Sequence, residues 1–507
     1  MRIFELIFTT ILFIMIFLNL MRGHIIKFLN NRKYVIYCSY ASAVFFAMLG
    51  ICLEGFRFIM LPQYLIALIL CLIEVVRVIR GHLVKSIPTR KQSVTKKKHR
   101  ILRALGRILL CLMFLLAIIL VWYFPVKNLP KPSGDSKVGT VIMDFTNPTR
   151  NNILTGAPES QKIAAQIWYP TLDTKGKQRV NWMMNRKVAS LFAQRMGLPD
   201  IFGQLSFVQT NSYLNAPLTT VSEKYPVVLF SGGGGMFNGQ NVIQMEELAS
   251  NGFIVVAVSH PADDFATVYS DGTVLGYDNQ LSDAINDDMS QAISSMKSKY
   301  NTDDTTPEMQ RITLKAAKLS IEDVKVWAED IIFIANQLVK LNDGSIESMF
   351  EGKMDTSQFG VFGHSLGGAA AGQTCIMDNR FKAFINIDGS PFGDAVDRTL
   401  TQPFMVLETG SDSSIKFRAR DGYSPEQTNY LVVSVEGTEH MNFTDLNTIL
   451  PRIGKSFGIL GKIDTDKQMA ITNAYVLAFF NHYLKGYSEP LLENTESPFS
   501  EVDMSQR

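Results

Sequence analysis

Four long apolar stretches in the first quarter of the chain limit most strongly what it can fold into. They cover residues 3–20, 34–53, 59–76 and 108–124. Each is about as long as a helix that crosses the hydrocarbon core of a bilayer. The first could instead be a cleaved signal peptide, but no small-residue cleavage site follows it. We therefore expect residues 1–124 to form an all-α membrane region of four transmembrane helices.

The loops between these stretches differ in charge. Lysine and arginine are abundant in the first loop, around residues 22–33, and in the third, around residues 77–107, whereas the second has only Arg57. Basic loops are retained in the cytoplasm. The pattern predicts a multi-pass protein of the cell membrane in which everything after Phe124 lies on the extracytoplasmic side. Lys96–Lys98 belongs to this signal, although contact with anionic lipids is an alternative.

Net charge and cysteine positions limit the class of protein further. A net charge of +2 over 507 residues argues against a nucleic-acid-binding protein, which usually has a marked basic excess. Four of the five cysteines lie in the apolar stretches, so Cys375 is the only one left for the rest of the chain. We therefore expect an exported part without internal disulfides, stabilised by a large core.

The chain after the membrane region divides into three parts. Residues 125–137 contain three prolines and are predicted to be a short, stiff tether that reaches at most about 45 Å. Residues 138–487 alternate strand and helix patterns, which predicts a doubly wound, mainly parallel α/β sheet with a helical insertion at about 275–325. An apolar stripe from Leu281 to Met296 is either a lid or a packed helix face. Residues 488–507 are expected to form a polar C-terminal tail.

A Gly-His-Ser-Leu-Gly motif lies at residues 363–367, between a predicted strand at 358–362 and a helix-compatible segment at 368–374. This order is the setting in which G-x-S-x-G forms a nucleophile elbow, with Ser365 exposed on a sharp turn. The motif alone is a weak signal, because a glycine-rich turn with an inert serine has the same pattern.

Four glycines at residues 232–235 follow a buried-strand pattern at 227–230. No Gly-Lys-Ser/Thr follows, so the loop is not a phosphate-binding P-loop. Bare backbone N–H groups after a strand fit one half of an oxyanion hole. A flexible turn is the plain alternative.

A catalytic serine needs a histidine base and an orienting carboxylate. His364 lies inside the elbow, His260 precedes the serine, and His482 lies in a predicted closing helix. His440 follows a predicted strand downstream of Ser365, which is the chain order typical of such elbows. It is the predicted base by elimination.

Two carboxylates are candidates for the acid. Asp388 follows the first predicted strand after the elbow, and Asp412 follows the second. Both positions suit a triad acid, and position alone does not decide between them.

Three segments around these residues resemble the platelet-activating factor acetylhydrolase family, plasma or type II. They are the elbow with its extra glycine (363–368), the strand-end Asp388, and Glu439-His440-Met441-Asn442-Phe443-Thr444-Asp445. Segments 167–170, 230–234 and 248–255 are similar to upstream parts of the family.

The resemblance implies an α/β-hydrolase fold over the last two-thirds of the chain. It implies Ser365 as nucleophile, Asp388 as acid and His440 as base, with the N–H groups of Gly234 and Leu366 as the oxyanion hole. Two departures concern the glycine loop. This chain has Gly232-Gly233 where the family usually has His-Gly. It has Gly234 at a position where a bulkier residue is common in the family.

The expected function is therefore a membrane-anchored serine ester hydrolase acting on short-acyl or phospholipid-like esters. Its expected partners are a lipid or small ester and the membrane, without nucleic acid. The sequence contains no metal or cofactor motif, and this chemistry needs neither. A general carboxylesterase, a polyester-type hydrolase or a lipase is the alternative, and an inactive hydrolase-fold membrane sensor is a more distant one. Neither the physiological ester nor the oligomeric state follows from the sequence.

Overall fold

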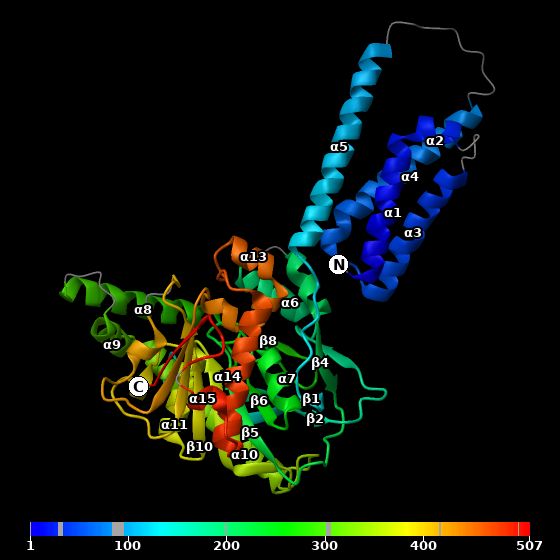
Figure 1. Ribbon diagram of the computed structural model, residues 1–507. Coiled ribbons are helices and arrows are strands. Elements are labelled where there is room, and N and C mark those ends of the chain that lie inside the picture. The colour runs from blue at the N-terminus through cyan, green and yellow to red at the C-terminus, as the bar shows by residue number, and fades with distance from the viewer. Residues whose placement is uncertain are drawn as a thin grey trace. The chain divides into compact units, whose positions relative to one another are not determined.

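A computed structural model describes residues 2–28, 34–83, 96–197, 200–300, 306–414, 417–494 and 496–506. The chain divides into two compact units, Met1–Lys127 and Asn128–Arg507 (Figure 1). Residues 29–33 and 84–95, which carry part of the predicted basic loops, lie outside the described residues.

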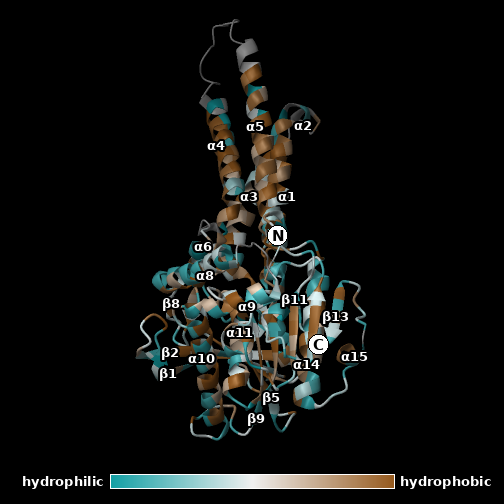
Figure 2. Cartoon of the chain, turned by 90° about the vertical axis from the view of Figure 1, so that its left-hand side faces the viewer, coloured by the Kyte–Doolittle hydropathy of each residue, from teal (hydrophilic) through white to brown (hydrophobic). Residues whose placement is uncertain are grey.

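The first unit consists of helices α1 (Ile3–Leu20), α2 (Arg22–Phe28), α3 (Tyr34–Glu54), α4 (Leu61–Leu83) and α5 (Lys96–Tyr123), with a short 3-10 turn η1 (Phe58–Met60). Four helical segments in the described residues are long and apolar enough to cross a membrane. Hydrophobic residues predominate along α1, α4 and α5 (Figure 2), and many of their large apolar side chains face outward. These helices suggest membrane association.

Two carboxylates inside the described part of the first unit pair with arginines. Arg57 is fully buried, and its guanidinium donates to Glu5 at 2.7 Å and to the carbonyl of Phe124 at 2.6 Å. At the other end of the bundle, Glu74 pairs with Arg22 and Arg77. Glu5 and Glu74 thus each face an arginine, the kind of partner that a carboxylate within a membrane needs.

The second unit is built on an eleven-stranded sheet with the order β13-β12-β11-β10-β9-β5-β6-β2-β1-β4-β3. Its six central strands, from β6 to β12, run parallel. They are β5 (Tyr225–Ser231), β6 (Ile254–Val258), β9 (Met354–His364), β10 (Phe381–Ile387), β11 (Phe404–Thr409) and β12 (Tyr430–Val435). The other five are β1 (Lys137–Asn151), β2 (Pro158–Thr171), β3 (Arg179–Asn181), β4 (Gln209–Leu214) and β13 (Val502–Gln506). The predicted mainly parallel α/β fold is confirmed.

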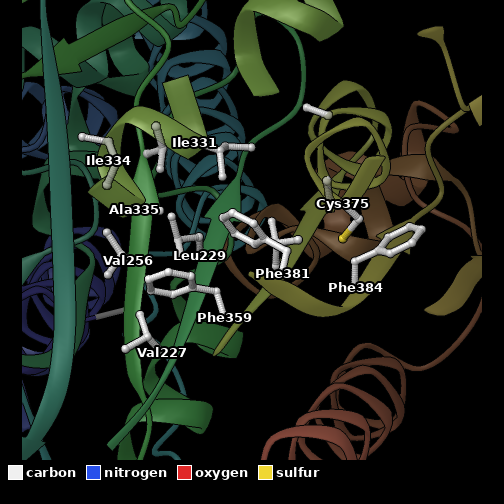
Figure 3. Close-up of a cluster of buried hydrophobic side chains, with 14 of the residues drawn as sticks. Val227, Leu229, Val256, Ile331, Ile334, Ala335, Phe359, Cys375, Phe381 and Phe384 are labelled. Carbon is white, nitrogen blue, oxygen red and sulfur yellow. The ribbon is translucent and has the colours of Figure 1, made fainter. Parts of the chain in front are cut away.

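Alternating side chains of the central strands face two helical layers. Val227 and Leu229 of β5 pack with Ile331 and Ile334 of α10 (Lys318–Asn342) (Figure 3). Also in this core is Cys375 of α11 (Leu366–Met377). On the opposite face, the Phe230 ring lies 4.7 Å from that of Phe362, which contacts Phe480 of α14 (Thr465–Lys485). Helix α7 (Val242–Ser250) packs beside α14. The sheet is therefore covered on both sides.

The region predicted as an insertion contains helices α8 (Asn279–Tyr300) and α9 (Pro307–Ala316). A hairpin of β7 (Ala266–Val268) and β8 (Val274–Gly276) precedes α8. Residues 301–305 lie outside the described residues. Leu281 packs against Ile153 and Val326. Further along α8, Met289 and Ala292 pack with a cluster that includes Leu314 and Val324. The Leu281–Met296 stripe is thus a packed helix face.

Both ends of the second unit differ from the expected linker and tail. Leu129 is buried and its N–H donates to the Gln209 carbonyl at 2.9 Å, while the Ser133 N–H donates to Glu247 of α7. Much of the proline-containing segment therefore lies on the second unit.

The C-terminal segment forms α15 (Pro490–Glu493) and β13, which pairs antiparallel with β12. The segment expected to be a polar tail thus contains a five-residue edge strand, a run too short to be predicted from its sequence pattern alone.

Candidate active site

Ser365 occupies a strained turn between β9 and α11. Its backbone has φ 56° and ψ −123°, a region that side chains other than glycine rarely adopt. A Cβ on Gly363 would lie 2.1 Å from the Gly367 carbonyl oxygen, and one on Gly367 would lie 2.2 Å from the carbonyl oxygens of Ser231 and Gly232. The turn thus requires both glycines of the motif, and it has the geometry of a nucleophile elbow.

His440 and Asp388 meet at the carboxyl ends of their strands. Asp388 follows β10, and His440 begins the short 3-10 turn η6 (His440–Phe443) after β12. The Nδ1 atom of His440 lies 2.7 Å from Oδ2 of Asp388. Asp412 instead accepts a hydrogen bond from the Gly437 N–H at 2.9 Å. Of the two candidate acids, the structure brings Asp388 to the histidine.

The Asp388 carboxylate is held in its ionised form. Burial alone would raise its pKa, but hydrogen bonds and charge from His440, together with the Thr409 N–H at 3.0 Å, outweigh burial, and the pKa lies below its ordinary value. Asp388 can therefore orient and stabilise a protonated His440 across the neutral pH range.

The glycine loop lies directly against the elbow. The Gly233 N–H donates to Oε1 of Gln240 at 2.8 Å, which fixes this end of the loop. A Cβ on Gly234 would lie 3.4 Å from Cδ2 of Leu366. Gly234 and Leu366, the predicted oxyanion-hole residues, are thus neighbours.

His364 packs beside the predicted base. Its Nδ1 lies 3.0 Å from Nε2 of Gln240, and its Nε2–H donates to the His440 carbonyl at 3.1 Å. Burial, followed by the neighbouring His440, lowers the pKa of His364 to about 3. A neutral His364 therefore supports the backbone of His440. The sequence placed this histidine only inside the elbow and gave no sign of its contact with His440.

A cavity of about 590 Å³ opens over these residues, lined by Ser365, His364, His440 and the glycine loop. The rest of the lining is mostly apolar and comes from α6 (Arg186–Arg195), η3 (Asp200–Phe207), α12 (Leu446–Ile449), α13 (Pro451–Ser456) and the segment after α13. Its apolar members include Phe192, Phe202, Met441, Leu450, Ile453 and Leu460. Ester carbonyls with apolar substituents suit such a cavity.

Residues 122–490 match the family model described as platelet-activating factor acetylhydrolase, isoform II. The chain belongs to this family. It is 26% identical to the platelet-activating factor acetylhydrolase of Cavia porcellus over 381 residues, covering 72% of this chain and 80% of that protein. It is also 25% identical to a probable 1-alkyl-2-acetylglycerophosphocholine esterase of Arthroderma benhamiae, covering 55% and 65% of the two chains. The protein is thus an ester-hydrolysing enzyme.

A solved structure supports the same fold for this acetylhydrolase-family enzyme. A ferulic acid esterase from Streptomyces cinnamoneus aligns with a TM-score of 0.56 at 22% identity, covering 75% of this chain and all of the other. The likeness concerns the fold alone.

The two remaining histidines of the second unit do not line the cavity described above. His482 is at the end of α14, and its Nδ1 lies 2.9 Å from the Tyr487 carbonyl. His260 is completely buried and stacks on Trp327, with ring centroids 3.9 Å apart. Neither side chain is among the described residues that line the cavity.

Proposed function

We propose that this enzyme is a membrane-anchored serine ester hydrolase in which Ser365, His440 and Asp388 form the catalytic triad. His440 removes the proton from the Ser365 hydroxyl as the oxygen attacks the ester carbonyl, and Asp388 stabilises the resulting imidazolium. His440 then gives the proton to the departing alcohol. Water, activated by the same histidine, hydrolyses the acyl-enzyme and restores Ser365.

The N–H groups of Gly234 and Leu366 hold the oxyanion of the tetrahedral intermediate in this proposal. These two residues are neighbours in space, one in the glycine loop and the other in the first turn of α11. Preorganised backbone donors of this kind stabilise charge that develops during acyl transfer. Glycine in place of the bulkier residues common in the family leaves the backbone donors unchanged.

The observation that carries the proposal is the His440–Asp388 hydrogen bond of 2.7 Å at the wall of the cavity that also exposes Ser365. An inactive sensor would need neither the strained serine nor the paired histidine. We propose a short-acyl or phospholipid-like ester as substrate, because the cavity is apolar and the relatives are named as acetylhydrolases and an acetylglycerophosphocholine esterase. A general carboxylesterase, a polyester-type hydrolase or a lipase is the second candidate.

The proposal places the four apolar helical segments in the cell membrane and the hydrolase unit on the extracytoplasmic side. It rests on the length and hydropathy of these segments and on the basic loops of the sequence.

The test is hydrolysis of nitrophenyl and phospholipid esters of increasing acyl length by the purified full chain. Acetyl to butyryl esters should be cleaved much faster than palmitoyl esters, and Ser365→Ala should lose several orders of magnitude in kcat. Alanine keeps the Cβ of the strained turn, so the fold should persist. Ser348→Ala, a serine outside the cavity lining, is the control. Equal activity on palmitoyl esters would favour the lipase, and an active Ser365→Ala would contradict the proposal.

A further inference from the structure

A second array of serine, histidine and aspartate lies beneath the catalytic edge of the sheet. Oγ of Ser231 is 2.9 Å from Nε2 of His260, and Nδ1 of His260 is 3.0 Å from Oδ2 of Asp330. Arg150 closes the array, with Nε 2.9 Å and Nη2 3.0 Å from the two Asp330 oxygens. All three triad-like side chains are fully buried.

This array is not a second catalytic centre. None of its members belongs to the described lining of the cavity, and substrate cannot reach a serine with no exposed surface. His260 is neutral, because burial lowers its pKa more than Asp330 raises it. Its Nδ1–H then donates to Asp330, and its Nε2 accepts the hydroxyl proton of Ser231. The bonds form a directed chain from α10 to the end of β5.

The position of the array is what distinguishes it from an ordinary buried ion pair. Ser231 lies on the same face of β5 as Val227 and Leu229, which pack on α10. Ser231 is the next residue on this face, and its partners are the polar side chains of His260 and Asp330 instead of apolar ones. Buried charged groups of this kind are seldom the most stable way to fill a core. A role other than stability is therefore worth testing.

Ser231 is the last residue before the glycine loop. Its carbonyl and that of Gly232 lie so close to Gly367 that a Cβ there would come within 2.2 Å of both oxygens. The loop is thus fixed at two points, by His260 through Ser231 and by Gln240 through the Gly233 N–H. Gly234 follows directly after these two points.

We infer that Ser231, His260 and Asp330 are positioning residues that aim the glycine loop at the developing oxyanion. The inference rests on the proposed role of Gly234. A loosened loop would still admit the substrate but would stabilise the transition state less. The effect should therefore fall on kcat rather than on KM.

The test compares Ser231→Ala with Ser259→Ala in the full chain. Ser259 is equally buried, and its hydroxyl bonds the Ala164 backbone on the neighbouring strand, so both variants lose one buried hydroxyl. For nitrophenyl acetate, Ser231→Ala should lower kcat about 10- to 100-fold with KM changed less than about twofold, as expected for a displacement of catalytic groups. Inactivation by a fluorophosphonate, which also forms a tetrahedral centre at the serine, should slow in parallel. Ser259→Ala should leave both rates unchanged.

Asp330→Asn acts on the same array from its far end and should lower kcat with the same unchanged KM. Melting temperatures of all variants separate lost stability from lost positioning. If Ser231→Ala and Ser259→Ala had equal rates while the enzyme still required Ser365, this inference would be overturned and the proposed function would stand. Activity that survives Ser365→Ala would overturn the proposed function instead.

Discussion

A serine in the left-handed region of backbone space costs on the order of 1–3 kcal/mol, which the rest of the turn must offset. The surroundings of Ser365 provide this through hydrogen bonds from its N–H to the Ile387 carbonyl at 2.8 Å and from the Gly368 N–H to its carbonyl at 2.9 Å. Asp388 is also in this region, with φ 52°. Two of the three proposed triad residues thus stand in strained positions at neighbouring strand ends.

The identity of the acid is the first prediction at this scale. Asp388→Asn should lower kcat by several orders of magnitude, because the amide favours the wrong tautomer of His440. Asp412→Asn should have a mild effect, since Asp412 only accepts the Gly437 N–H. Steady-state kinetics of both variants on one short ester checks this, and the reverse order would assign the acid to Asp412.

Glu246 gives a prediction about pH. It is buried in α7, and its carboxyl accepts hydrogen bonds from the N–H and Nδ2 of Asn211. Burial raises its pKa to about 7, although these hydrogen bonds and Ser212 lower it. The folded state then keeps a proton that the unfolded state releases near pH 4.5. The free energy of unfolding therefore falls as pH rises from about 4.5 to about 7, and above that range both states are ionised.

Glu246→Gln removes that dependence. Between pH 4.5 and 8, the free energy of unfolding of the wild type should fall by on the order of 1–3 kcal/mol relative to the variant. Urea unfolding of both proteins at the two pH values measures the difference. A difference between the two proteins that does not change with pH would contradict the assignment.

Sequence reasoning proposed Ser365, the two candidate acids and His440, because chain order and turn chemistry point to residues at strand ends. It missed Gln240, Thr409 and the supporting role of His364. Their contacts join segments far apart in the chain, and no local pattern encodes such contacts.

At the scale of elements, the buried strands and the long amphipathic helix α10 were predictable because their apolar periodicity is strong. The short helices that form the apolar part of the cavity lining were not predictable from the sequence. Helices α6, α12 and α13 have ten, four and six residues, and η3 is a 3-10 helix. Such short elements show too few turns to define a face. The stripe on α8 gave a clear helical signal, but only the structure shows that it packs against neighbours.

The segment after α13 gives a prediction about acyl preference. Leu460 is buried and lines the cavity, and it contacts Gly454, where a Cβ would lie 2.4 Å from Leu460 Cδ1. Leu460→Ala should lengthen the apolar space and raise kcat/KM for hexanoyl relative to acetyl esters. The gain should be roughly fourfold for each additional CH₂ that becomes buried, equivalent to about 0.8 kcal/mol.

Leu281→Ala is the matched control, because Leu281 is similarly buried but packs on Ile153 and Val326. It should lower the melting temperature without changing the ratio of rates on the two esters. A change in acyl preference by Leu281→Ala would mean that α8 acts as a lid after all.

At the scale of the whole molecule, segregation of apolar residues into the first quarter of the chain indicated two units of different kinds. The linker and the C-terminus were harder to predict. Proline content suggested a short, stiff tether, yet the Ser133 and Gly134 N–H groups donate hydrogen bonds to side chains of α7. The short strand β13 depends on β12 for its hydrogen bonds. Both features arise from tertiary contacts of short polar segments.

The orientation in the membrane is a prediction at this scale. In intact cells, a membrane-impermeant maleimide should label Lys127→Cys and should label Lys96→Cys only after the membrane is opened, since the basic third loop is predicted to be cytoplasmic. The unsubstituted chain gives the background of the five native cysteines. Labelling of Lys96→Cys alone in intact cells would reverse the proposed topology.

The central claim is that Ser365 is an activated nucleophile, and labelling of the full chain in its membrane with a fluorophosphonate probe tests it most directly. An activated serine reacts with such a probe, whereas an ordinary hydroxyl does not. We predict a single adduct, located by peptide mass spectrometry on Ser365, that is absent in Ser365→Ala and strongly slowed in His440→Ala. An unlabelled wild-type chain, or an adduct on another residue that survives Ser365→Ala, would contradict the account.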